Sequence, residues 1–204
     1  MHNISYYLTA MIPYMLTAAI LAVPVRIAYT HRLRRKKLKS NIYHETGLII
    51  YISFIAGLFS QTILTNIHTF RFGQVRSFIN LIPGKIIYDS ITLWQHGDKR
   101  YFVISLLGNI IMFMPFGFFT PLLWNNKSLR DSLLAGFLAS LTVEICQLPQ
   151  LNRTTDIDDL WLNTFGAFLG WMCYKLMLKL FPKFAAKFRI EKFFRKQKSR
   201  LFSS

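Results

Sequence analysis

The chain is poor in acidic residues and in cysteine. Only 9 Asp and Glu stand against 25 Lys and Arg in 204 residues. The two cysteines, Cys146 and Cys173, form no CxxC pair and no disulfide framework, and both fall in apolar segments, as small packing residues do. The sequence also lacks HExxH, GxSxG and GxxxxGKS/T, so it shows no familiar zinc, hydrolase or nucleotide site, and no cofactor is expected.

The excess of basic residues is confined to two blocks. The net charge of +16 would suit a nucleic-acid-binding protein if it were spread over one face. Instead, one basic block covers 31–39, after the first apolar segment, and the other covers 175–200, at the end of the last one. Basic residues beside apolar segments set membrane topology and attract anionic lipid, so no nucleic-acid partner is expected.

The apolar residues come in long blocks. They make up 52% of the chain and give a positive mean hydropathy of +0.31. A helix needs about 20 residues to cross about 30 Å of hydrocarbon. We therefore predict an all-α, multi-pass membrane protein with five spans, near 6–28, 46–66, 101–123, 132–149 and 159–181. The first span lacks a basic n-region and is expected to stay in the membrane, not to be cleaved as a signal peptide.

The basic residues also predict the orientation. With five spans, one side carries six basic residues within 32–39, two at Lys127 and Arg130, and ten within 175–200, whereas the other side carries six. The positive-inside rule then places the N-terminus outside and the C-terminus in the cytoplasm. In the external segment, 85–94 has apolar residues near helical spacing, which fits either a short helix on the outer leaflet or an ordinary loop. The tail from 182 fits either a basic interfacial helix or a disordered segment.

The third predicted span contains a polar residue and a helix breaker. Asn109 lies about eight residues into the span, roughly 12 Å from its outer edge. Pro115, followed by Gly117, removes a backbone donor and is expected to kink or loosen the helix. Asn109 then either contributes to a pocket or joins two helices by a hydrogen bond.

The fourth span contains a carboxylate. Glu144 and Gln147 lie on one face, and Glu144 is about 7 Å below the outer boundary, where a lone charge is costly. Arg153, just outside, is the nearest counter-ion in the sequence. The pair is either purely structural, or Glu144 is kept for ligand or proton chemistry. Asn163, roughly 6 Å deep in the fifth span, is expected to lie at a similar depth.

An acidic run, Asp156-Ile-Asp158-Asp159, opens the fifth span. It lacks the Gly and final Glu of a calcium loop, so an N-cap role for Asp156 or Asp158 is favoured over metal binding. Gly166 and Gly170 follow on the same helical face as Asp159, at a spacing that favours close helix packing.

Together these residues resemble the VanZ family. The resemblance covers about 78–178 and rests on the order and spacing of four elements: Asn80-Leu-Ile-Pro83, Asn109 to Gly117, Glu144-Ile-Cys-Gln147, and Arg153 through Asp156, Asp159, Asn163 and Gly166 to Gly170. Gly84 stands where the family pattern leads us to expect Phe. The family consists of bacterial integral membrane proteins, and its namesake is linked to low-level teicoplanin resistance. The resemblance implies a cell-envelope role and supplies no reaction.

The resulting organisation has three parts. Residues 1–66 form a two-span helical hairpin with a basic cytoplasmic loop, 67–181 form the VanZ-like unit, and 182–204 form a basic cytoplasmic tail. The leading hypothesis is a binding protein whose outer-leaflet pocket recognises a polar head group of a membrane lipid, a lipid-linked wall precursor or a lipoglycopeptide. The candidate binding residues are Asn109, Glu144, Gln147, Arg153, Asp156, Asp159 and Asn163. The alternatives are an enzyme that uses Glu144 with Asp156 or Asp159 as acid and base, and a purely structural membrane partner.

Overall fold

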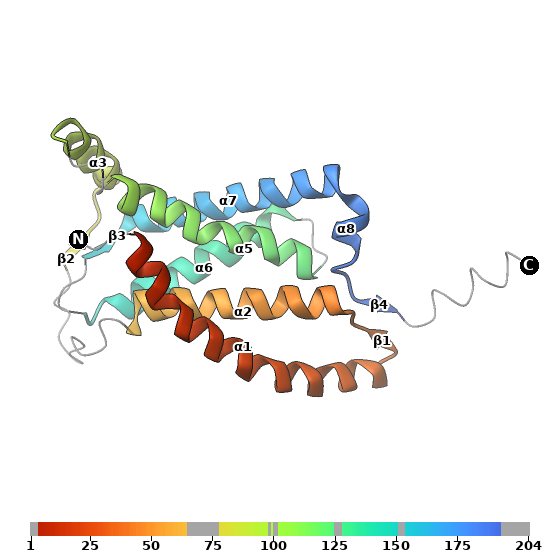
Figure 1. The fold of residues 1–204 in the computed structure, drawn as a ribbon. Helices are drawn as coiled ribbons and strands as arrows, with labels where there is room; N and C mark the ends of the chain where they lie inside the picture. The colour runs from red at the N-terminus through yellow and green to blue at the C-terminus, as the bar shows by residue number, and fades with distance from the viewer. Residues whose placement is uncertain are drawn as a thin grey trace, which may run out of the picture.

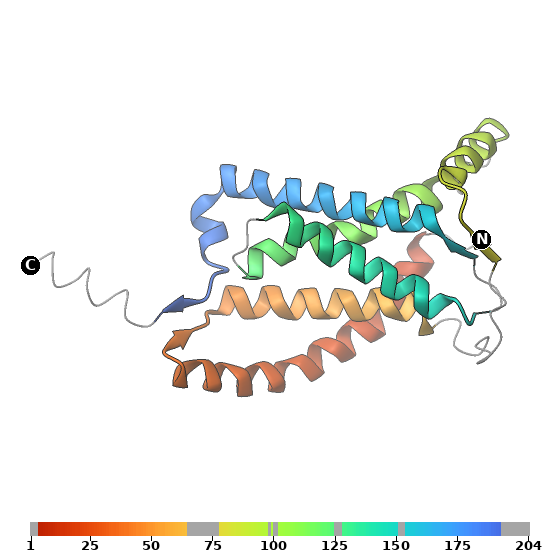
Figure 2. The ribbon, with the colours of Figure 1, turned by 180° about the vertical axis from the view of Figure 1, so that it is seen from behind.

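Five long helices lie side by side and make up the bundle. The computed structural model describes residues 4–64, 78–97, 99, 102–124, 128–150 and 154–192. Figures 1 and 2 show the bundle from two opposite sides. Its helices are α1 (Ile4–Arg35), α2 (Ile42–Thr62), α5 (Gly108–Trp124), α6 (Leu129–Gln147) and α7 (Ile157–Leu180).

The all-α prediction is confirmed, and each of the five apolar blocks is helical. Within the described residues, three helical stretches are long and apolar enough to cross a membrane: Thr9–Arg35, Ile42–Thr62 and Ser105–Trp124. Charged residues interrupt the other two helices, with Arg130, Asp131 and Glu144 in α6 and Asp158, Asp159, Lys175 and Lys179 in α7. The apolar helices indicate a membrane protein.

Helices α5 and α7 touch through glycine. A Cβ atom added at Gly166 would overlap the carbonyl oxygen of Ile110, and one at Gly170 would overlap that of Met114. From the other side, a Cβ at Gly117 would overlap the carbonyl oxygen of Ala167. Backbone therefore packs directly on backbone along this interface. Helix α5 continues through Pro115, and the irregular turn lies before it, as the π-helix η2 (Phe102–Leu107).

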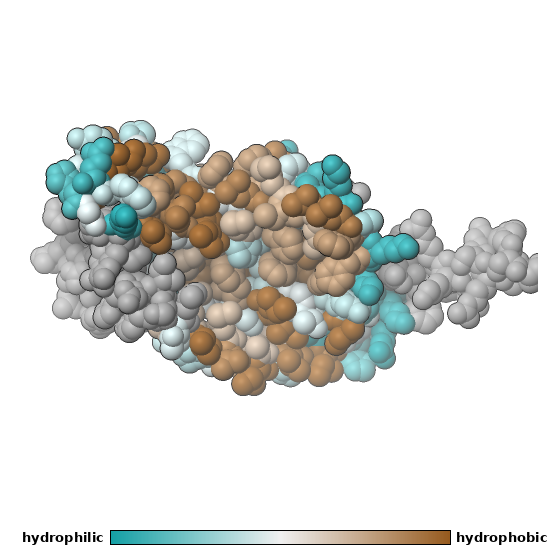
Figure 3. Space-filling model, turned by 45° about the horizontal axis from the view of Figure 1, so that its top comes forward, coloured by the Kyte–Doolittle hydropathy of each residue, from teal (hydrophilic) through white to brown (hydrophobic). Residues whose placement is uncertain are grey.

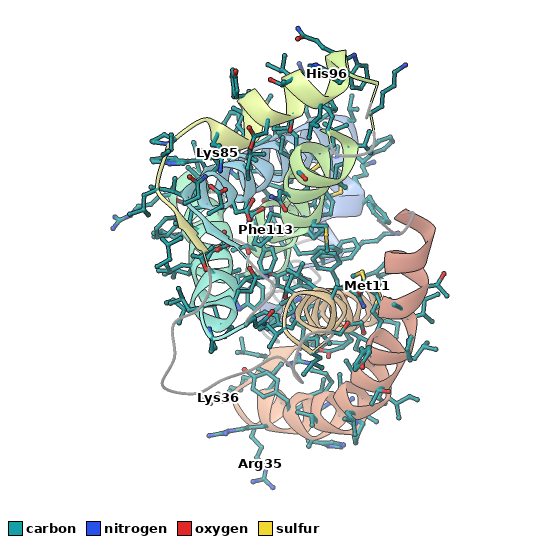
Figure 4. The ribbon with its side chains drawn as sticks, turned by 90° about the vertical axis from the view of Figure 1, so that its left-hand side faces the viewer. Met11, Arg35, Lys36, Lys85, His96 and Phe113 are labelled. Atoms are coloured by element: carbon teal, nitrogen blue, oxygen red, sulfur yellow. The ribbon has the colours of Figure 1, made fainter. Side chains whose placement is uncertain are left out.

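Aromatic rings fill the space between α2 and α5. Tyr51 stacks on Phe119 with 5.4 Å between ring centroids and meets Phe116 edge-on at 5.9 Å. Phe113 belongs to the same cluster of buried residues and lies in the interior when the bundle is viewed along its length (Figure 4). Tertiary packing of this kind, and not helix propensity alone, holds such a bundle together.

One end of the bundle carries a small sheet and a projecting helix. Strand β2 (Phe78–Asn80) pairs in parallel with β3 (Thr154–Asp156), which leads directly into α7. Helix α3 (Lys85–Gln95) follows β2 and extends outward from Lys85 to His96 at the edge of the bundle (Figure 4). The sequence of this segment fits either a helix or a loop, and the structure shows a helix.

At the opposite end, the C-terminal part of the chain folds back on α2. Helix α8 (Pro182–Ala186) turns from the end of α7 toward α2 (Figures 1 and 2), and β4 (Glu191–Lys192) pairs antiparallel with β1 (Leu38–Lys39). The described part of the tail is thus one helical turn and a strand, not a continued basic helix, because Pro182 starts a new helix after α7 ends. Residues 193–204 lie outside the described part.

The surface divides along the long direction of the bundle. Apolar side chains predominate on the sides, and hydrophilic ones gather at the two ends (Figure 3). Large apolar residues such as Ile20 on α1, 71% exposed, and Leu138 on α6, 56% exposed, face outward. An apolar belt between two polar ends is the surface expected of a protein that sits in a bilayer.

Candidate functional site

Asp156 joins β2 to α7. Its carboxylate accepts a hydrogen bond from Asn80 Nδ2 across 2.8 Å and another from the backbone N–H of Asp158 across 3.0 Å. The second bond makes Asp156 the N-cap of α7, as the sequence predicted for Asp156 or Asp158. Asn80 in turn accepts a hydrogen bond from the N–H of Ile82, which shapes the loop before α3.

Asp158 caps a different helix. Its two carboxylate oxygens accept hydrogen bonds from the backbone N–H groups of Gly84, at 2.7 Å, and Ile86, at 2.9 Å. Gly84 is the N-cap residue of α3 and has φ +84°, a left-handed conformation that glycine adopts without strain. The glycine at this position, where the family pattern suggested Phe, therefore fits the turn that starts α3.

Glu144 and Asp159 lie beside these two aspartates. Glu144 is 4% exposed, and its Oε2 accepts a hydrogen bond from the backbone N–H of Asp156 across 3.3 Å. Asp159 accepts a hydrogen bond from Asn109 Nδ2. Asn109 stands in the first turn of α5, directly after the π-helix. We call Glu144, Asp156, Asp158 and Asp159 the acidic cluster.

Asn163 lies one helical turn below Asp159. It is 3% exposed and donates a hydrogen bond from Nδ2 to Ser140 Oγ across 2.8 Å. Its Oδ1 and the hydroxyl of Thr155 are buried and have no hydrogen-bond partner among the described residues. A buried polar atom of this kind is usually satisfied by water or a ligand, so these two atoms are candidates for contact with one.

Gln147 makes its hydrogen bond with α2 and not with the acidic cluster. Its Nε2 donates a hydrogen bond to the carbonyl of Thr62, the last residue of α2, across 3.3 Å. Gln150 donates to the same carbonyl across 3.4 Å. Of the residues expected to converge, the structure brings Asn109, Glu144, Asp156, Asp159 and Asn163 to one end of α5, α6 and α7, and it ties Gln147 to α2. Arg153 lies outside the described residues.

The chemistry of the acidic cluster is that of hydrogen-bond acceptors. No group of three or more His, Cys, Asp or Glu side chains that could hold a metal ion is found in the described part of the chain. Carboxylates and an amide oxygen match a partner that carries hydroxyl, amine or amide N–H groups. Such donors are common in sugars and peptides, and far less so in lipid tails.

Sequence reasoning missed two features. Asn80 and Asp158 position α3, whereas the sequence alone indicates only a family element for Asn80 and a helix cap for Asp158. Arg26 in α1 forms a two-point ion pair with Glu45 in α2, with Nε–Oε2 at 2.7 Å and a second contact at 3.0 Å. The signal was present in the sequence: the two opposite charges flank the basic loop of a predicted hairpin.

Comparisons with known proteins identify the family of this chain. The chain matches the VanZ/LLP1 family model over residues 46–178, a range that includes the acidic cluster and all three interface glycines. It is 33% identical over 75 residues to Protein VanZ of Enterococcus faecium, a stretch that covers 37% of this chain and 47% of that protein. The chain thus spans about half the length of this curated relative. No solved structure matches it. The chain belongs to the VanZ/LLP1 family.

Proposed function

We propose that this VanZ-like protein binds a polar head group in the bacterial cell envelope, at the end of the bundle that carries the acidic cluster. The observation that supports this most directly concerns Asn163 Oδ1 and Thr155 Oγ1, two of the five buried side-chain polar atoms that have no partner among the described residues. Thr155 directly precedes Asp156, and Asn163 lies one turn below Asp159. Leaving such atoms unsatisfied is costly, so a bound molecule or water has to meet them.

The acceptors favour a head group that is rich in donors. Glu144, Asp156 and Asp159 would receive hydrogen bonds from sugar hydroxyls or from peptide amines and amides. Arg153, next to the cluster in sequence, would meet a phosphate. A lipid-linked wall precursor or a lipoglycopeptide carries these groups. Binding of a lipoglycopeptide would contribute to teicoplanin tolerance, in line with the family's namesake.

The protein would cross the plasma membrane five times, with the acidic cluster at the outer surface and the C-terminus in the cytoplasm. This proposal is supported by the basic residues near the opposite end, from Arg32 to Lys39 and in α8. Helix α3 would lie on the outer leaflet. Three apolar side chains on it are well exposed, Tyr88 at 71%, Ile91 at 50% and Trp94 at 44%, and they recur at helical spacing.

The test is the exchange of one buried acid for its amide. Glu144→Gln keeps the shape of the side chain and removes its charge, and Asp89→Asn on α3 serves as the matched control outside the cluster. Lipids that co-purify with each protein in mild detergent are identified by mass spectrometry. We expect a head-group class that is present with the wild type and with Asp89→Asn, and lost with Glu144→Gln. The same lipids on all three proteins would overturn the binding proposal.

A structural role for the polar residues is the second candidate. The hydrogen bonds Asn163–Ser140 and Asp156–Asn80 join separate elements, as such a role requires. If Glu144 were only half of a structural pair with Arg153, Glu144→Gln would lower the yield of folded protein. The double change Glu144→Gln with Arg153→Gln would then restore both yield and teicoplanin susceptibility to wild-type values. A well-folded but inactive single variant favours binding, and a lipid product formed by the wild type alone would indicate an enzyme.

A further inference from the structure

A second site lies at the opposite end of the bundle and does not depend on the proposed function. A pocket of about 490 Å³ opens between α2, α5, α7 and α8. Its walls are almost entirely apolar and include Thr46, Gly47 and Ile50 of α2, Phe119 of α5, Met177 of α7 and Phe188 after α8. A volume of this size falls in the range of small-molecule sites, roughly 300–1,000 Å³.

The pocket exists because α8 spans a gap in the bundle. Helix α7 packs on α5 and α6, and α8 turns from its end toward α2 (Figures 1 and 2). This turn is fixed by a contact between distant residues: His44 Nδ1 donates a hydrogen bond to the carbonyl of Phe188 across 2.7 Å. The rings of Tyr43, Phe184 and Phe188 meet at its mouth, with centroids 5.3–6.3 Å apart. The pocket is thus built by the fold and held open at one end.

The mouth of the pocket combines apolar and basic groups. Ile42 and Ile50, which line the pocket, are 72% and 50% exposed. Lys187 lies over the ring of Tyr43 at 4.8 Å, and Lys183 is exposed on α8. The basic residues after α1, from Lys36 to Lys39, come to the same end through the β1–β4 pairing. The pocket therefore lies at the end of the bundle where basic residues gather, and Lys187 contacts one of its lining residues, Tyr43.

From this arrangement we propose that the pocket holds one acyl chain of an anionic phospholipid, with the phosphate bound by Lys183 and Lys187. The apolar walls match a hydrocarbon chain and offer little to a polar ligand. The lysines favour a head group with net negative charge over a zwitterionic one, because their attraction to phosphatidylcholine is offset by choline. A peptide chain fits less well, since its backbone would find few hydrogen-bond partners in these walls.

The test uses the full-length protein in vesicles that contain photoreactive lipid. Phosphatidylglycerol and phosphatidylcholine with the same chains, each with a diazirine near the chain end, are cross-linked to the wild type. The labelled peptides are then mapped by mass spectrometry. We expect the label to concentrate in 42–50, 118–122 and 177–188, with phosphatidylglycerol ahead by about fivefold for each contributing lysine. Label spread equally over the exposed face of α1, or equal labelling by the two lipids, would overturn the proposal.

Variants separate the chain from the head group. Thr46→Phe fills the pocket and should remove the label, and Lys183→Gln with Lys187→Gln should remove the preference for phosphatidylglycerol. Lys85→Gln on α3 is the matched control and should change neither. Displacement of the lipid by soluble glycerol phosphate would show that the head group alone is bound, which would overturn an acyl-chain site. Because the mapping is done on the wild type, a variant that fails to fold does not remove the test.

Discussion

The carboxylate of Asp158, in the first turn of α7, accepts a hydrogen bond from the backbone N–H of Ile86 in α3, with 2.9 Å between the two atoms. Its other oxygen receives the N–H of Gly84. A side chain of one helix therefore caps another helix that lies 72 residues earlier in the chain. Helix α3 projects from the bundle, and this cap helps to fix where it starts.

Removing that cap should loosen α3. Asp158→Ala leaves two backbone donors without their partner, and the loss of an N-cap costs about 1–2 kcal/mol. We expect faster hydrogen exchange at the amides of Gly84 and Ile86, while amides in the middle of α5 stay protected. Asp89→Ala on α3 is the control and should leave the amides at 84 and 86 unchanged. Equal protection in Asp158→Ala and wild type would show that the cap does not hold α3.

The α5–α7 interface should reject any side chain at Gly166. An added Cβ would meet the backbone of Ile110, which cannot move as a side chain does. Gly166→Leu is expected to lower the thermal midpoint in detergent far more than Cys173→Leu, which places the same side chain at an exposed position of α7. The neighbouring Ala167 is 0% exposed and is itself part of the packing, so it is no control. Equal tolerance at 166 and 173 would contradict the close approach.

Loss of the Asn163–Ser140 hydrogen bond should cost more stability than the bond itself contributes, because Asn163 stays buried without a partner. Ser140→Ala would leave a second atom of Asn163 buried and unpaired, at about 1–3 kcal/mol. Replacing both partners, as Ser140→Ala with Asn163→Leu, removes the polar group and should recover much of that loss. The comparison is made by thermal unfolding in detergent. Recovery would not occur if Asn163 were held by water or a ligand that contributes more than Ser140.

The Arg26–Glu45 pair should behave as a partly buried ion pair. The two side chains are 14% and 15% exposed, and Ser40 also donates to Glu45. Glu45→Gln leaves Arg26 without its charge partner between α1 and α2, and we expect a loss below the roughly 3–5 kcal/mol of a fully buried pair, because both side chains keep some exposure. The double change Arg26→Met with Glu45→Leu should be more stable than Glu45→Gln alone. Equal stability of Glu45→Gln and wild type would mean that the pair is screened by solvent.

Topology is checked by labelling from outside the cell. In a background without Cys146 and Cys173, a cysteine at position 96, after α3, should react with an impermeant reagent in intact cells. A cysteine at position 37, near β1, should react only after the cells are opened. Both native residues are exposed, so accessibility within the fold does not limit either reaction. The reverse pattern would place the acidic cluster on the cytoplasmic side.

The positions of the bundle helices were largely predictable, because they follow from the positions and lengths of the apolar blocks. Blocks near 46–66 and 159–181 correspond to α2 at Ile42–Thr62 and α7 at Ile157–Leu180. The N-cap of α7 was also within reach, since it depends on Asp156 and its immediate neighbours. What failed was anything set by pairing between distant segments, such as the β1–β4 and β2–β3 ladders.

In the candidate site, too, local features were predictable and contacts between distant segments were not. Helical spacing placed Asp159, Asn163 and Gly166 on one face, and the structure turns that face toward α5 and α6. Spacing could not show that Asn80 meets Asp156 across 76 residues, or that Gln147 would bind the end of α2. The first contact depends on the pairing of β2 with β3, and the second on how α6 packs against α2. Neither is recorded in a local sequence pattern.

The bond between His44 and Phe188 joins residues that are 144 positions apart in the chain. During synthesis, α1 and α2 emerge from the ribosome long before Phe188 has been made. At the start of α2, Tyr43 and His44 therefore lack their partners in the C-terminal part of the chain until that part has been synthesised. The contact that seats α8 against α2 can therefore form only after nearly all of the described chain has been synthesised.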